Sequence, residues 1–367
     1  MEMEDQGKTC SNETMVATTT TTTKMANSSS PMKPLEYTGA LKVLLVCSTM
    51  AIAVLLLYYT SINKFGQSFP SLYGFNYGSS SSIHNGSYDE LRKVLKAAAT
   101  KENTVIITSL NEAWAAPNSI YDLFLESFNL GNNTAKLIDH LVVVAVDDDA
   151  YERCKATVSH CYLLKSKQSS QMAHEAVFMT PIYMDMMWQR LAFLHTVLSL
   201  GYNFVFTDTD VMWFRSPFRH FVPSSDFQTS SDYFNGRELD KRNTPNNGFL
   251  FVWSNTRTIA FYDFWVSSRH DYPGSHEQEV FNRIKNGPFV KRIGLKIRFM
   301  STDYFGGYCN PSRDMNKVCT MHANCCVGLD RKIADLKTTL EDWKIYFHSN
   351  QTGSQPSHWR APKACHM

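Results

Sequence analysis

One stretch of the 367-residue sequence joins a buried strand to two carboxylates, and it constrains the fold more than any other. Residues 202–206 are mostly aromatic or β-branched and follow Gly201, which predicts a short buried strand. The chain then reads Asp208-Thr-Asp210. In open α/β sheets, ligands bind beyond the carboxyl ends of the strands. The stretch therefore predicts an α/β protein with a functional site at these two aspartates.

The spacing of Asp208 and Asp210 favours a divalent metal. Two carboxylates this close repel each other unless a cation or a proton lies between them. Hard oxygen ligands suit Mg²⁺ or Mn²⁺, which commonly keep positions for water and a substrate diphosphate. We therefore expect the two aspartates to hold a divalent cation. The alternative is that both residues only cap a turn, a common role for aspartate.

The N-terminal part of the chain predicts a membrane anchor. Residues 1–41 are rich in Thr and Ser without apolar periodicity and predict a disordered tail. Residues 42–60 contain a mainly apolar run, Val43–Tyr59, which predicts one transmembrane helix at the short end of the required length. Residues 61–87 predict a stem or linker, and residues 88–367 a single large domain. The net charge of +2, without a long basic run, gives no indication of nucleic-acid binding.

Charge and cysteines suggest which side of the membrane holds the large domain. Lysines on the N-terminal side of the apolar run outnumber those close on the other side, which favours a type II orientation with the bulk of the chain in the lumen. The predicted lumenal part carries sequons at Asn85, Asn132 and Asn350 and seven cysteines. We expect Cys154 to pair with Cys161, and Cys309 with one of Cys319, Cys325 or Cys326. Since seven is odd, at least one thiol is free or pairs between chains.

The remaining periodicities predict an alternation of helices and strands. Thr104–Leu110 and residues 141–146 are apolar runs typical of buried strands, and a helix between them makes a βαβ unit with a parallel sheet. A helix beginning at Thr180-Pro181 leads to Gly201. Further along, the pattern predicts strands at 249–253 and 293–299, a helix from Ser275 that ends at Gly287-Pro288, and helices at 88–99 and 330–343.

Five segments together resemble the plant nucleotide-diphospho-sugar transferase family of glycosyltransferases, which includes relatives of extensin arabinosyltransferases and rhamnogalacturonan II xylosyltransferases. The segments are Thr108-Ser-Leu-Asn-Glu-Ala-Trp114, Phe206-Thr-Asp-Thr-Asp-Val-Met-Trp-Phe214, Asn246-Asn-Gly-Phe249, Tyr272-Pro-Gly-Ser-His-Glu-Gln-Glu-Val-Phe-Asn282 and His322-Ala-Asn-Cys-Cys-Val-Gly-Leu329. One departure is visible, because Glu277 stands where the family pattern has Asp.

The resemblance implies a GT-A fold, a Rossmann-like mixed sheet flanked by helices. It also implies transfer from a nucleotide sugar, a UDP-sugar by expectation, to a cell-wall polysaccharide or glycoprotein with retention of configuration. A Golgi membrane enzyme agrees with the anchor predicted above. The metal would be Mn²⁺, or Mg²⁺ as the second choice, and it would assist departure of the diphosphate. The ligands implied are Asp208, Asp210 and His322. Asp210 would bind the metal directly, and Asp208 would bind the donor ribose or reach the metal through water.

Further roles follow from the same resemblance. Thr108 and Asn111 would hold the base and ribose, and Arg190 would meet the diphosphate. Asn246 and Asn247 would line the sugar and acceptor pocket. The catalytic group would comprise Asp208, Asp210, Glu277 and Gln278, with the last two stabilising positive charge at the anomeric carbon.

Several of these residues also have a structural interpretation. Arg190 suits a surface charge, and Asn246 with Asn247 a plain turn before a strand. Gln278 with Ser275 fits a capping box. His322 suits a structural histidine, or a zinc site with Cys319, Cys325 and Cys326, although the spacing matches no common zinc pattern.

Two other functions fit parts of the sequence. Phe206–Val211 matches the motif of haloacid-dehalogenase-type phosphohydrolases, in which Asp208 would be the nucleophile and Asp210 the acid–base. That motif usually opens its domain, whereas about a hundred folded residues precede it here. The second alternative is a non-catalytic Golgi scaffold or lectin-like binder on the same fold. Intact carboxylates and His322 argue against it.

Overall fold

The computed structural model describes residues 47–53, 81–165, 173, 178–352 and 358–365, and the chain divides into two units, Met1–Ser79 and Ser80–Met367. In the first unit, residues 47–53 are helical and exposed. Among the described residues, no helix is both long and apolar enough to span a bilayer. The rest of the predicted membrane span, 42–60, lies outside the described residues, as do the predicted tail and residues 61–80 of the predicted linker.

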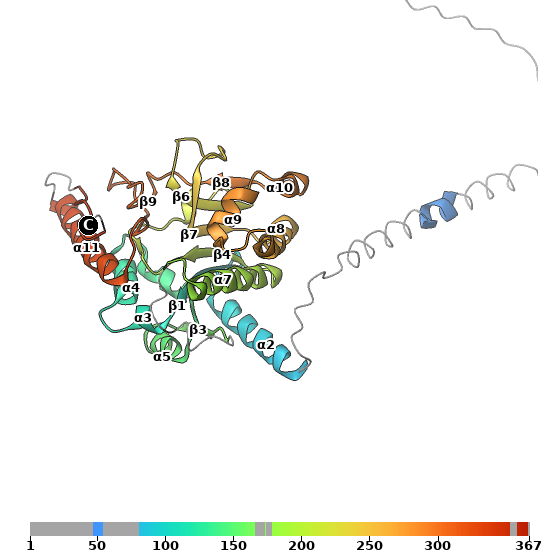
Figure 1. Ribbon diagram of the computed structural model, residues 1–367, viewed down its shortest axis with the longest axis horizontal. Coiled ribbons are helices and arrows are strands. Elements are labelled where there is room, and N and C mark those ends of the chain that lie inside the picture. The colour runs from blue at the N-terminus through green and yellow to red at the C-terminus, as the bar shows by residue number, and fades with distance from the viewer. Residues whose placement is uncertain (1–46, 54–80, 166–172, 174–177, 353–357, 366–367) are drawn as a thin grey trace, which may run out of the picture. The chain divides into compact units, whose positions relative to one another are not determined.

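The second unit is built on a mixed seven-stranded sheet, which confirms the predicted α/β class (Figure 1). Its strand order is β3-β2-β1-β4-β7-β6-β8. Strands β3, β2, β1 and β4 run parallel, β7 is antiparallel to β4 and to β6, and β8 is parallel to β6. The strands are β1 (Thr104–Leu110), β2 (Leu141–Ala145), β3 (His160–Leu163), β4 (Asn203–Thr207), β6 (Phe227–Tyr233), β7 (Thr244–Val252) and β8 (Ile297–Phe299).

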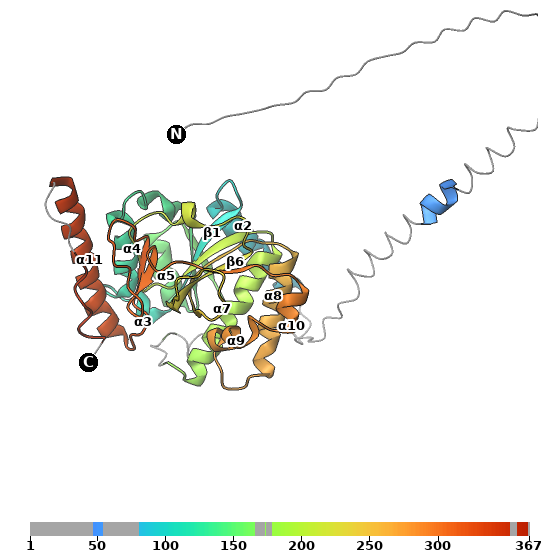
Figure 2. The same ribbon diagram turned by 90° about the horizontal axis from the view of Figure 1, so that it is seen from above.

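Helices cover both faces of this sheet, because alternate strand residues point to opposite sides (Figures 1 and 2). Ile106 and Val205 pack toward α3 (Glu112–Ala115), α4 (Ile120–Leu130), α5 (Asp148–Thr157) and α11 (Leu329–Thr352). Val105 and Phe204 pack on the other side toward α2 (Ser81–Ala98), α7 (Pro181–Ser199), α8 (Thr256–Ser267) and α9 (Glu277–Ile284). The two buried layers fix the carboxyl ends of the parallel strands at one edge.

A second, three-stranded sheet begins where β4 ends. It comprises β5 (Val211–Trp213), β10 (Thr320–His322) and β9 (Phe305–Gly307) in the order β5-β10-β9. The turn at residues 208–210 therefore connects the two sheets. Short elements complete the fold: α10 (Pro288–Arg292) and the 3-10 helices η1 (Ala135–His140), η2 (Phe218–His220) and η3 (Ser268–His270).

Most predicted elements are confirmed, with differences at their ends. Thr104–Leu110 is a strand over the predicted range, and Thr180 caps the helix that starts at Pro181. Helix α2 begins at Ser81, inside the predicted linker. The predicted strand at 293–299 was wrong over its first half. The preceding helix, α9, already ends at Ile284, and Pro288 starts the short helix α10, as proline favours a first helical position.

Disulfides agree with the predicted local pairs. Cys154 binds Cys161, and Cys309 binds Cys325. Cys326 binds Cys365, a pairing that the sequence did not indicate. Cys319 is the buried free thiol that the odd number required. The zinc alternative at His322 was wrong because Cys325 and Cys326 are both consumed in disulfides.

Candidate metal centre

The register of the small sheet brings His322 beside the two aspartates. In the antiparallel pair of β10 and β5, His322 lies opposite Val211, the residue after Asp210. The amide of Ala323 also donates to the carbonyl of Asp210 at 3.0 Å. The three side chains therefore meet although 112 residues separate Asp210 from His322 (322 − 210).

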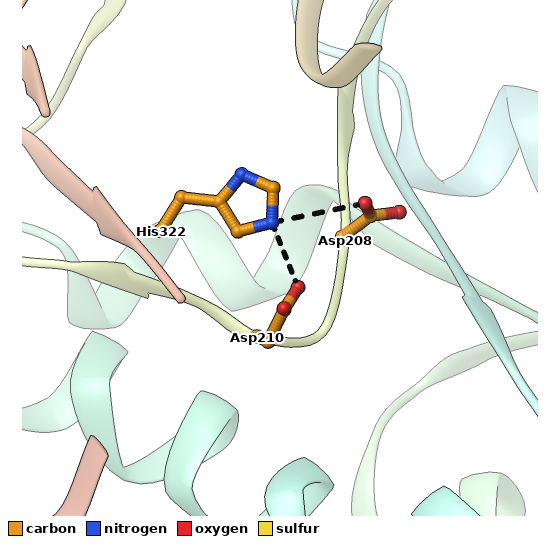
Figure 3. Close-up of side chains that lie close together, drawn as sticks. All are labelled: Asp208, Asp210 and His322. Atoms are coloured by element: carbon orange, nitrogen blue, oxygen red, sulfur yellow. Dashed lines mark ion pairs between the residues drawn. The ribbon is translucent and has the colours of Figure 1, made fainter. Parts of the chain in front are cut away.

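The geometry of the three side chains suits a cation. One ligand atom from each of Asp208, Asp210 and His322 lies within 4.8 Å of the others. Figure 3 shows Nε2 of His322 pointing between the carboxylates, 3.1 Å from Oδ1 of Asp210 and 3.9 Å from Oδ2 of Asp208. Within the described residues, Oδ1 of Asp210 is buried without a hydrogen bond. A buried acceptor left open beside an imidazole fits a metal site, and this donor set suits Mn²⁺.

The capping alternative for the two aspartates finds no support. Their carboxylates accept from Arg190 and Lys332, while the turn is closed by the amide of Val211 and the carbonyl of Asp208.

A glycine makes room for this arrangement. The carbonyl of Gly248, in β7, accepts from the amide of Asp208 at 2.7 Å. A Cβ atom at Gly248 would lie 2.6 Å from Oδ2 of Asp208, and closer still to Cε1 of His322. No side chain fits there without displacing a candidate ligand.

Arg190 joins two of the predicted catalytic carboxylates. Its Nη1 donates to Asp208 at 2.8 Å and its Nη2 to Glu277 at 2.7 Å, and the guanidinium stacks on the ring of Phe206. The Arg190 side chain is 11% exposed, so the surface-charge alternative was wrong. Burial opposes the ionisation of Glu277, but the guanidinium of Arg190 keeps the pKa of this carboxyl below its usual value. Burial instead raises the pKa of Asp208, although Arg190 opposes that rise.

Lys332, which the sequence analysis missed, pairs with Asp210. Its Nζ lies 2.5 Å from Oδ2 of Asp210 and over the ring of Trp114. Burial would raise the pKa of Asp210, but Lys332 and His322 together lower it below its usual value. Burial would lower the pKa of His322, but the carboxylates of Asp210 and Asp208 raise it above its usual value. The only signal in the sequence was a lysine ten residues after His322, in the first turn of a predicted helix (332 − 322).

The predicted substrate residues lie next to this centre, in a strand and not in a turn. Asn246 and Asn247 belong to β7, so the plain-turn alternative was wrong. The side-chain amide of Asn247 is buried, and neither its Nδ2 nor its Oδ1 has a hydrogen bond within the described residues. Gln278 does not cap its helix. His276 is the N-cap residue, and Oε1 of Gln278 accepts instead from the amide of Asn247 at 2.8 Å.

Thr108 and Asn111 lie at the carboxyl end of β1, the strand next to β4. Thr108 directly follows Ile107, which pairs with Phe206. Its hydroxyl is buried without a hydrogen bond in the described part of the chain. Asn111 caps α3, because its Oδ1 accepts from the amide of Trp114 at 3.2 Å. The structure thus groups the predicted residues along one edge of the sheet.

Comparison with known proteins gives a consistent family. The sequence model described as nucleotide-diphospho-sugar transferase matches residues 136–336, which include the candidate metal centre and Lys332. One uncharacterized Arabidopsis thaliana protein is 47% identical over 289 residues, 78% of this chain and 76% of that protein. A second is 39% identical over 303 residues, 80% and 91% of the two chains. A solved glycosyltransferase involved in glycosylation of the major capsid of PBCV-1 is 13% identical, over 64% of this chain and 98% of that one, with a TM-score of 0.38.

Proposed function

The chain belongs to the nucleotide-diphospho-sugar transferase family and is a glycosyltransferase; on that premise we propose that it transfers a sugar from a UDP-sugar to a cell-wall polysaccharide or glycoprotein, with retention and with Mn²⁺ or Mg²⁺. The observation that carries the proposal is the meeting of Asp208, Asp210 and His322 at the carboxyl end of β4. The family match spans the Asp-Thr-Asp turn, so it favours a transferase over the phosphohydrolase alternative.

Charge balance supports a phosphorylated donor. Among the described residues, the three carboxylates of Asp208, Asp210 and Glu277 form ion pairs with two permanently charged side chains, those of Arg190 and Lys332. A bound divalent cation would outweigh this excess negative charge and, as a Lewis acid, would offset the negative charge of a departing diphosphate. Asp208, Asp210 and His322 would hold it.

The protein's own groups supply orientation and charge. Arg190 fixes Asp208 and Glu277, and its remaining N–H groups are suited to the diphosphate. Asn246 and the open amide of Asn247 would bind sugar hydroxyls, since a buried amide without a partner is costly unless a ligand completes it. Thr108 and Asn111 would contact the nucleoside. Glu277 and Gln278 would stabilise positive charge at the anomeric carbon.

A donor screen tests the proposal. The purified chain is incubated with separate UDP-sugars, including arabinofuranose, xylose and galactose donors, with Mn²⁺ or with chelator. Released nucleoside diphosphate is measured, and the anomeric configuration of the product is read by NMR. We expect turnover of one donor, lost on chelation. Nucleotide binding without metal, and no turnover of any donor, would favour the scaffold alternative, while an inverted product would contradict retention.

The same proposal places the protein in the Golgi membrane, in type II orientation with the transferase unit in the lumen. The apolar run at 43–59 and three disulfides in the second unit support this location, because disulfides persist in oxidising compartments. Protease treatment of sealed vesicles checks the orientation. A C-terminal tag that is digested without detergent would contradict it.

Lys332 gives a prediction with two opposite effects. Its ammonium competes with a cation for Asp210, so Lys332→Met is expected to tighten Mn²⁺ binding several-fold. Donor turnover is expected to fall about 10²-fold, because the positive charge that Lys332 holds at Asp210, beside the site proposed for the diphosphate, is lost. Calorimetry without donor measures the first effect and steady-state kinetics the second.

Lys344→Met is a matched control for this substitution. It removes a lysine from the same helix that pairs with Glu126, away from the centre. Weaker Mn²⁺ binding in Lys332→Met would contradict the proposed competition.

A further inference from the structure

One carboxylate beside the candidate metal centre has no part in the chemistry described so far. Asp232, in β6, accepts hydrogen bonds from three side-chain amides. Its Oδ1 accepts from Nδ2 of Asn246 at 2.7 Å and from Nδ2 of Asn324 at 2.8 Å. Its Oδ2 accepts from Nε2 of Gln278 at 3.1 Å. Among the ion pairs of the described residues, none involves Asp232. Its three donors are neutral side-chain amides, because Sγ of Cys309, 3.4 Å from Oδ1, is in a disulfide and has no proton to donate.

The other end of each amide is fixed as well. Oδ1 of Asn246 accepts from the amide of Gly248 at 2.9 Å, and Oε1 of Gln278 from that of Asn247 at 2.8 Å. Oδ1 of Asn324 accepts from the amide of Cys309 at 3.1 Å. A backbone N–H requires the oxygen of each side-chain amide, and a carboxylate requires its nitrogen. A side-chain amide can exchange the positions of its oxygen and nitrogen by a half-turn. Asp232 permits only the orientation in which each nitrogen points toward its carboxylate.

These amides reach Asp232 from segments far apart in the chain. Asn246 borders the candidate metal centre, and Gln278 binds the neighbouring Asn247. Asn246 comes from β7, Gln278 from the first turn of α9 and Asn324 from the loop after β10. A Cβ at Gly248 would lie between the centre and Asn246, 2.6 Å from Oδ2 of Asp208 and 3.0 Å from Oδ1 of Asn246. The orientation of these amides therefore decides what the edge of the centre offers to a substrate.

We propose that Asp232 is a positioning residue for the transfer reaction: its carboxylate fixes the amides of Asn246 and Gln278 in the orientation that the reacting sugar meets. The inference rests on the proposed function, and it goes beyond that function by assigning a role to a residue that holds neither metal nor donor. An asparagine at position 232 would have one accepting oxygen, whereas the aspartate has two. If that oxygen still accepted from Asn246 and Asn324, the new nitrogen would face the side-chain nitrogen of Gln278. Gln278 would then rotate to accept from position 232, and this rotation would place its nitrogen against the backbone amide of Asn247.

A double-mutant cycle tests this arrangement. The four proteins are wild type, Asp232→Asn, Gln278→Glu and the double variant. Asp232→Asn places two donors against each other, and Gln278→Glu places two carboxylates against each other. The double variant restores donor–acceptor pairing, because a carboxylate at position 278 accepts both from the new side-chain amide at position 232 and from the backbone amide of Asn247. Asp240→Asn serves as control, since it removes a carboxylate from the loop between β6 and β7 that pairs with Arg242.

We expect Asp232→Asn to lower kcat about 10- to 100-fold, as misplaced site groups do, with binding of UDP and Mn²⁺ within about twofold of wild type. The double variant is expected to exceed Asp232→Asn in kcat by at least about fivefold, a coupling that independent sites do not show. Asp240→Asn should match wild type. A double variant no better than the product of the two single effects would overturn the proposal, as would an unchanged kcat in Asp232→Asn.

Urea unfolding of the same four proteins distinguishes a failure of this proposal from a failure of the proposed function. If wild type turns over no donor, the proposed function fails, and coupling between positions 232 and 278 in the unfolding midpoints still supports the fixed orientation. No coupling in the midpoints would then overturn it. If Asp232→Asn does not fold, a folded double variant supports the proposal and an unfolded one contradicts it.

Discussion

Replacing Asp210 by alanine is expected to lower donor turnover by about 10³-fold or more and to abolish measurable Mn²⁺ binding. The Asp210 carboxylate is 1% exposed, lies 3.1 Å from His322 and carries a buried acceptor, Oδ1, without a hydrogen bond in the described chain. Its removal also leaves Lys332 without its carboxylate partner at a largely buried position. Turnover and calorimetric Mn²⁺ binding measure the effect.

Asp226→Asn is the control for Asp210→Ala, because it removes a buried carboxylate and its ion pair without changing the candidate metal centre. Asp226 is likewise buried, and it accepts from Arg257 at 2.6 and 2.9 Å and from the amide of Lys296 at 2.9 Å, away from the centre. This variant is expected to lower the unfolding midpoint and to keep the Mn²⁺ affinity of wild type. Undiminished Mn²⁺ binding in Asp210→Ala would remove Asp210 from the ligand set.

The sequence analysis predicted the parts of the site that local patterns encode. The strand before Asp208 is apolar and β-branched, and it ends where the carboxylates begin, so residue order alone placed them at a sheet edge. His322 came from the family resemblance, and its position beside Asp210 depends on the register of β10 against β5. No periodicity within either strand indicates that register.

The roles that were missed or misjudged depend on contacts across the chain. Lys332 reaches Asp210 from 122 positions away, and Arg190, for which a surface charge was the alternative, pairs with Glu277 87 positions away. Both are charged residues within helices. Sequence alone does not show whether such a side chain is exposed to solvent or pairs with a buried group of opposite charge. Ser275 and Gln278 have the spacing of a capping box, but Asp232 and Asn247 bind Gln278 from the sheet. Tertiary hydrogen bonds replaced the local one.

Gly248, in β7, leaves no space for a side chain between the sheet and the candidate metal ligands. Its carbonyl holds the amide of Asp208, and its α-carbon is next to both Asp208 and His322. The backbone of Gly248 has little freedom to retreat, because its carbonyl accepts from the amide of Asp208 at 2.7 Å and its amide donates to Oδ1 of Asn246 at 2.9 Å. A single added methyl group must therefore displace candidate ligands.

Gly248→Ala is accordingly expected to lower turnover about 10²-fold or more, since small displacements of reacting groups have effects of this size. It is also expected to weaken Mn²⁺ binding and to reduce the free energy of unfolding by about 1–3 kcal/mol, the usual cost of overpacking. Gly287→Ala is the matched control, because its φ of −66° suits alanine and the nearest atom to its Cβ would be the carbonyl oxygen of Ile284 at 3.0 Å. If Gly248→Ala binds Mn²⁺ as tightly as wild type while only its stability falls, the two side chains that its methyl group meets, Asp208 and His322, are not the metal ligands.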